Sequence, residues 1–86
     1  YVAAICAAPS ILGHIGALKG CTATWFPGFE NELEGASRSS QPVCVSGRII
    51  TGKGAGVAVD FALRIVAELC GSQKSAAIKK SIQCQN

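Results

Sequence analysis

The amino-acid sequence predicts an α/β fold, in which short apolar strands alternate with helices. Residues 2–5 form an apolar run that leads into a helix pattern, residues 42–51 resemble a hairpin, and residues 57–69 have the strongest helical pattern. Such alternation is typical of sheets whose two faces are covered by helices. The 86 residues amount to one domain or less.

The chain also looks incomplete as a fold. It contains no methionine, and it begins within an apolar strand that has no partner strand before it. We therefore expect a fragment, a processed half or one piece of a larger domain.

The predicted strand Val2–Ile5 ends at Cys6, and a helix pattern begins at Pro9, with small alanines between them. This layout is that of a nucleophile elbow, a tight strand-to-helix turn that presents a reactive side chain. Orphan N–H groups and the helix dipole favour a thiolate beside a helix N-terminus. The alternative is a free buried cysteine that packs as a small apolar side chain.

The helix that begins at the proline should be short. Ile11, Leu12 and Ile15 predict an apolar face, and Gly16 predicts its end. His14 lies near that end with no carboxylate close in sequence, so we expect a surface or capping histidine.

The middle of the chain predicts short elements separated by turns. Residues 18–20 suggest a turn, residues 21–25 a short strand that Pro27-Gly28 breaks, residues 29–33 one or two helical turns, and residues 35–41 a polar loop. The acids of this region are Glu30, Glu32 and Glu34. Paired carboxylates can perform acid–base chemistry, but three acids at a spacing of two cannot share one helical face. We predict a solvated acidic turn.

Residues 42–45 and 48–51 are rich in strand formers and flank Ser46-Gly47, which predicts a hairpin. The following segment, Gly52–Gly56, could hold an anion at a helix N-terminus. It lacks the Ser or Thr of a P-loop and the third glycine of a dinucleotide motif. A tight backbone crossover into the next helix is the preferred interpretation.

The helix at residues 57–69 is nearly all apolar. Its charged residues recur every four positions and are Asp60, Arg64 and Glu68. We therefore expect burial beyond the sheet, by neighbouring helices or by a dimer partner. Cys70-Gly71 should end this helix and Ser72 should cap the last one. The inward face of the last helix is predicted to contain Ala76, Ala77, Ile78 and Ile82.

Composition excludes several classes of protein. No apolar run reaches 18 residues, which argues against a transmembrane helix, and the net charge of +3 without interleaved aromatics does not favour nucleic acid. Five irregularly spaced cysteines and one histidine give little support for a zinc site or a disulfide framework. Reduced thiols in the cytoplasm and no cofactor are expected, although a targeting segment before Tyr1 stays open.

Four segments resemble the C-terminal half of the ThiJ/PfpI superfamily, which includes deglycases and glyoxalase III-like proteins. They are Ala3-Ala4-Ile5-Cys6-Ala7-Ala8-Pro9, Thr24-Trp25-Phe26-Pro27-Gly28-Phe29, Ile49-Ile50-Thr51-Gly52-Lys53-Gly54-Ala55-Gly56 and Asp60-Phe61-Ala62-Leu63. The resemblance implies a flavodoxin-like three-layer sandwich, related to class I glutamine amidotransferases and commonly dimeric. Since that domain is about twice as long, residues 1–86 would be the C-terminal part of a single domain whose N-terminal half is absent.

The resemblance also implies a site. Cys6 matches the family's easily oxidised elbow cysteine, and the Ala7 amide matches a backbone donor that faces the thiol. The glutamate that shares a proton with the thiol belongs to the N-terminal half. Lys53 stands where an arginine is common, and with Gly54 and Phe26 it would line the substrate site.

Two departures affect the implied activity. Ala7 replaces the histidine of the protease-like branch, and Phe26 replaces a histidine that is frequent among deglycases. His14 matches neither, which disfavours a Cys–His peptidase. The leading hypothesis is a Cys6-dependent glyoxalase III or deglycase that acts on methylglyoxal-like 2-oxoaldehydes. The alternatives are a redox-sensing or chaperone-like stress protein and a remnant in which Cys6 is inert.

Overall fold

The computed structural model describes residues 1–84 and contains a three-stranded sheet at its centre. Strand β1 (Val2–Ile5) pairs in parallel with β5 (Ile49–Gly52), and β5 pairs antiparallel with β4 (Val43–Ser46). The α/β class, the first strand and the hairpin are thereby confirmed. Because Ile5 lies opposite Gly52, the carboxyl ends of the two parallel strands meet at one edge of the sheet.

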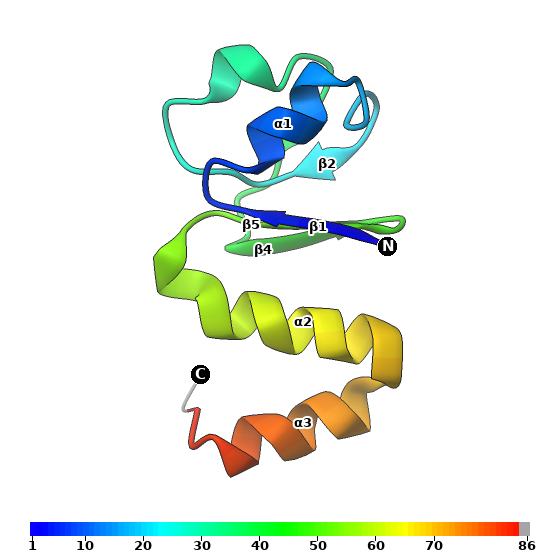
Figure 1. The fold of residues 1–86 in the computed structure, drawn as a ribbon, viewed down its shortest axis with the longest axis vertical. Helices are drawn as coiled ribbons and strands as arrows, with labels where there is room; N and C mark the ends of the chain where they lie inside the picture. The colour runs from blue at the N-terminus through cyan, green and yellow to red at the C-terminus, as the bar shows by residue number, and fades with distance from the viewer. Residues whose placement is uncertain (85–86) are drawn as a thin grey trace.

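One face of the sheet is covered by short elements that lie above it in Figure 1. They are helix α1 (Pro9–His14), strands β2 (Thr22–Ala23) and β3 (Ser37–Arg38), and the 3-10 turn η1 (Glu30–Glu32). The buried cluster of this layer consists of Leu18, Ala23, Trp25 and Leu33, with Leu12 and Phe29 packed against it. This core holds the segment that follows β2 close to the sheet.

The other face is covered by helix α2 (Ala58–Cys70), which the 3-10 turn η2 (Ala55–Val57) precedes. Helix α3 (Ser72–Ser81) packs against α2 on the side away from the sheet (Figure 1). Gly52 permits the close approach of α2, because a Cβ there would lie 3.0 Å from the Phe61 ring and 3.1 Å from the Ile5 side chain.

The long helix is found within one residue of the predicted range, and Gly71 ends it. None of the helices within residues 1–84 has the length and hydrophobicity needed to cross a bilayer.

Several predicted boundaries were wrong. The strand expected at residues 21–25 is only two residues long, and the predicted polar loop contains β3, which pairs in parallel with β2. Ser46 belongs to the hairpin strand because it pairs with Ile49, so the turn consists of Gly47 and Arg48. Strands of two residues are too short to show an alternating pattern in the sequence, and here they form because they pair with each other in the fold.

The apolar face predicted for α1 was wrong as well. Ile11 and Ile15 are 63% and 73% exposed, whereas Leu12 packs on the core. Positions four residues apart share one face of a helix, and the face that these two residues share points away from the core.

The predicted features of α3 also need correction. Ser72 lies inside the helix and forms no capping bond, because Gly71 occupies the cap position. Ala76, Ala77 and Ile82 are exposed, and Ile78 is half-buried. The reason is that α3 packs on α2 rather than on the sheet, so little of its surface is covered.

Within residues 1–84, α2 is itself covered less than its composition predicts. Leu63 is its one buried residue, at 8% exposed, and Val59 and Leu69 are 48% and 60% exposed.

Candidate functional site

The Cys6 residue forms a strained elbow directly after β1. Its φ angle of 65° lies in the left-handed region, which residues other than glycine rarely adopt. The Cys6 N–H donates to the Gly52 carbonyl at 2.9 Å, and the Cys6 carbonyl accepts from the Phe26 N–H at 2.9 Å. The half-buried cysteine is therefore held on one side by the end of β5 and on the other by the segment after β2.

The turn between Cys6 and α1 leaves one backbone donor free. The Ala7 carbonyl accepts from both the N–H and the Oγ of Ser10, at 3.0 and 2.6 Å. The Ala8 N–H donates to the Ile5 carbonyl at 3.1 Å. The Ala7 N–H donates to no group among residues 1–84, so it is available to an oxygen atom of a ligand.

Phe26, Lys53 and Gly54 lie together beside the elbow. They line an apolar hollow of about 370 Å³ that is completed by Pro27 and by residues 55–57. A Cβ on Gly54 would lie 3.6 Å from the Phe26 ring, and Lys53 is exposed. Cys6 does not line this hollow. It is connected to the hollow through the hydrogen bond that the Phe26 N–H donates to the Cys6 carbonyl.

His14 has an acidic partner that its sequence neighbours do not suggest. Its Nε2 atom lies 3.0 Å from Oε1 of Glu32, and both side chains are exposed. The pair connects α1 with η1 at the surface. The histidine is therefore at the surface, as predicted, but Glu32 is not a free member of a solvated acidic turn.

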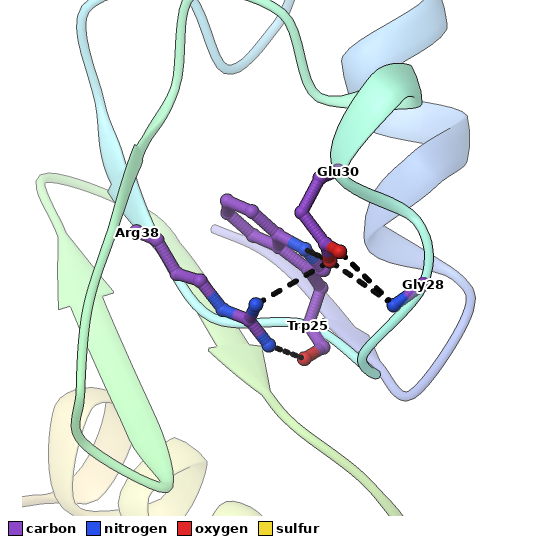
Figure 2. A network of polar contacts seen from close by, with 4 residues as sticks. All are labelled: Trp25, Gly28, Glu30 and Arg38. Carbon is purple, nitrogen blue, oxygen red and sulfur yellow. Dashed lines mark hydrogen bonds and ion pairs between the residues drawn. The ribbon is translucent and has the colours of Figure 1, made fainter.

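Glu30 is exposed, as expected for a solvated turn, but it is also the centre of the network in Figure 2. Its carboxylate accepts from the Trp25 indole N–H at 2.9 Å, from the Gly28 N–H at 3.1 Å and from Arg38 at 3.3 Å. The pKa of Glu30 lies below its ordinary value, chiefly because of the Trp25 bond and then because of the Gly28 N–H. Sequence reasoning missed this network because Arg38 lies eight residues from Glu30.

All five cysteines lie within residues 1–84, and all are free thiols. In this same part of the chain, no three His, Cys, Asp or Glu side chains are placed to hold a metal ion.

Comparison with known proteins gives a family for most of the chain. Residues 1–68 match the DJ-1/PfpI family. Protein dj-1beta of Drosophila melanogaster is 35% identical over 83 residues, which cover 94% of this chain and 44% of the fly protein. The Parkinson disease protein 7 homolog of Danio rerio is 37% identical over 81 residues, covering 91% and 43% of the two chains.

Solved structures agree with this family. The structure of Drosophila melanogaster DJ-1beta has a TM-score of 0.90 at 35% identity and covers 98% of this chain and 46% of its own. The oxidised form of Toxoplasma gondii DJ-1 has a TM-score of 0.87 at 33% identity, with 94% and 45% covered. The present chain is therefore part of a flavodoxin-like α/β fold and spans a little under half the length of these proteins.

Proposed function

Because the chain belongs to the DJ-1/PfpI family, as the resemblance of its four segments implied, we propose that Cys6 is the nucleophile of a glyoxalase III or deglycase activity. The substrates would be small 2-oxoaldehydes such as methylglyoxal. The observation that supports this most is the Cys6 elbow, a left-handed cysteine between a strand and a helix. Strained backbone at a chemically reactive side chain is characteristic of functional sites.

The chemistry begins with addition of the Cys6 thiolate to the aldehyde carbon. A C–S bond forms, and the carbonyl electron pair moves to the oxygen, where the free Ala7 N–H offers a hydrogen bond. In a glyoxalase, a carboxyl group then moves the proton from this carbon to the neighbouring ketone carbon. The first oxygen re-forms a C=O bond, and the former ketone oxygen takes up a proton and becomes the hydroxyl group. Water cleaves the resulting thioester, and a 2-hydroxy acid leaves as the thiol is restored.

The carboxyl group would come from the N-terminal half of the family's domain. Within residues 1–84, β1 is at the end of the strand order β1-β5-β4, and its outer edge has no partner strand. We propose that the N-terminal half of the family's domain pairs there and brings a glutamate to the elbow.

The hollow beside the elbow is the proposed substrate site. Phe26 and Gly54 supply apolar walls, and Lys53 supplies a positive charge that can attract a carbonyl oxygen. Lysine keeps the charge of the family's usual arginine but not its planar, bidentate geometry.

Replacing Cys6 tests this proposal. Cys6→Ser in the intact protein should reduce methylglyoxal turnover to the background rate, because a hydroxyl is a far weaker nucleophile at neutral pH. Cys70→Ser is the matched control, since this exposed cysteine at the end of α2 has no proposed role. Equal turnover by the parent and by Cys6→Ser would overturn the mechanism.

A redox-sensing or chaperone-like stress function is the second candidate. It is favoured by Ala7 and Phe26 at the family's histidine positions, and by the pairing of His14 with Glu32. Mild peroxide followed by mass spectrometry separates the two functions. Selective gain of two oxygens at Cys6 without aldehyde turnover supports the sensor. A separate alkylation assay tests the third alternative, an inert Cys6. Alkylation of Cys6 no faster than that of a free thiol at about pH 6 supports an inert residue.

We also propose a cytoplasmic homodimer that uses the exposed face of α2 and α3. Val59, Leu69 and Ile82 are 48%, 60% and 52% exposed. An almost wholly apolar groove of about 250 Å³ runs between the two helices and is lined by Ala62 and Ile78, among others. Covering this face would bury the apolar surface that α2 leaves open, while free cysteines fit a reducing compartment.

A further inference from the structure

We propose that Glu30 and Arg38 form a clamp on Trp25 that positions the Cys6 elbow. The inference rests on the proposed function of Cys6, which it deepens. Glu30 and Arg38 are positioning residues in this account, because they act on Cys6 through the backbone of residues 25 and 26.

The segment that follows β2 connects the clamp to the elbow. Thr24 donates its N–H to Oγ1 of Thr51 at 3.0 Å, and the Trp25 ring is buried in the core with 3% of the residue exposed. The next residue, Phe26, donates its N–H to the Cys6 carbonyl at 2.9 Å. The position of Trp25 therefore determines whether that donor reaches the elbow.

The clamp itself, shown in Figure 2, holds Trp25 from the surface. Arg38 donates from Nη2 to the Trp25 carbonyl at 3.2 Å and from Nη1 to the Glu30 carboxylate at 3.3 Å. Its guanidinium carbon lies 5.0 Å from the centroid of the Trp25 ring, within reach of a cation–π interaction. Glu30 in turn accepts from the indole N–H, so the side chain and the carbonyl of Trp25 are both held.

The clamp restrains Trp25, but its own two side chains bury little surface. The side chains of Glu30 and Arg38 are 52% and 41% exposed, and exposed ion pairs contribute little to global stability. A left-handed cysteine, by contrast, persists only while its surroundings hold it. If the Trp25 carbonyl loses its hydrogen bond from Arg38, the Phe26 N–H can move, and the Cys6 carbonyl can rotate out of the strained conformation.

The test measures the reactivity of the Cys6 thiol, as the rate at which iodoacetamide alkylates Cys6 in the purified protein. Mass spectrometry of the tryptic peptide that ends at Lys19 separates Cys6 from the other cysteines. Rates are recorded between about pH 5 and 9, an interval that includes the ordinary cysteine pKa of about 8.5. Far-UV circular dichroism confirms that each variant is folded under the conditions used.

Arg38→Ala should lower the alkylation rate about fivefold, the equivalent of one hydrogen bond of about 1 kcal/mol. Arg38→Lys, which keeps the charge but loses the fork, should restore part of the rate, and Glu30→Gln should give an intermediate loss. Glu34→Gln is the matched control, because its side chain forms no hydrogen bond among residues 1–84. Its rate should equal that of the parent.

Unchanged alkylation rates in the Arg38 and Glu30 variants would overturn the clamp. The clamp is equally overturned if these variants only melt at lower temperature while the folded protein reacts as the parent does. Methylglyoxal turnover is measured separately on the same samples. Absence of turnover in the parent counts against the proposed function, whereas the alkylation comparison decides the clamp in either case.

Discussion

The Cys6→Gly variant should have a higher free energy of unfolding than the Cys6→Ala variant. This reverses the usual order of glycine and alanine. In ordinary strands and helices, glycine is less favourable than alanine by about 0.5–1 kcal/mol. At a left-handed position the order changes, because a Cβ there costs roughly 1–2 kcal/mol. The φ angle of 65° places Cys6 in that region.

The size of the reversal follows from the surroundings of Cys6. Its side chain is half-buried, so the alanine methyl group gains roughly half of the 0.8 kcal/mol that a fully buried carbon contributes. Glycine also loses about 0.5–1 kcal/mol more chain entropy on folding than alanine does. Subtracting this and the methyl contribution of about 0.4 kcal/mol from 1–2 kcal/mol leaves Cys6→Gly more stable than Cys6→Ala by a few tenths of a kcal/mol, and by about 1 kcal/mol at most. Both variants lack the thiol, so the comparison isolates the backbone.

Urea denaturation of the two variants measures the difference in the free energy of unfolding, provided that their m values agree. The same pair of substitutions at Cys70, the last residue of α2, provides the reference. There alanine should be the more stable by up to about 1 kcal/mol. If alanine is favoured at Cys6 as strongly as at Cys70, the elbow is not strained, and the inferred connection between its geometry and a reactive thiol is refuted.

Other predictions concern a packed glycine, a hydrogen-bonded carboxylate and an exposed apolar face. Gly13→Ala should destabilise the protein by about 1–3 kcal/mol in urea titrations, because a Cβ there would collide with the Glu32 carbonyl; Gly56→Ala, where a Cβ meets no atom within 4 Å, should be neutral. The folded pKa of Glu30 is lowered, so its contribution to stability should be complete above the ordinary value of 4.5 and lost as pH falls through the lowered one; a stability gap between parent and Glu30→Gln that stays constant down to acid pH would contradict this. Val59→Glu should convert a dimer to a monomer in sedimentation at micromolar concentration; a monomeric parent would remove the dimer proposal.

The sequence by itself determined the features that depend on neighbouring residues. The apolar run at residues 2–5 and the hairpin around Gly47 follow local patterns of strand and turn formation, and the long apolar stretch specifies α2. The elbow was predictable in the same way, because a strand, a cysteine and a proline-initiated helix are adjacent in the chain. The family resemblance rested on parts of these segments and on residues 24–29.

Only the tertiary structure decided which polar groups meet. Glu30 binds Arg38 eight residues away, Arg38 reaches the Trp25 carbonyl across 13 residues, and His14 meets Glu32 across 18. No local periodicity encodes such contacts, because they form when loops return to the core rather than within one helix or strand. For the same reason the sequence could place Cys6 at an elbow, whereas the bond from Phe26 that holds its carbonyl became visible only in the folded chain.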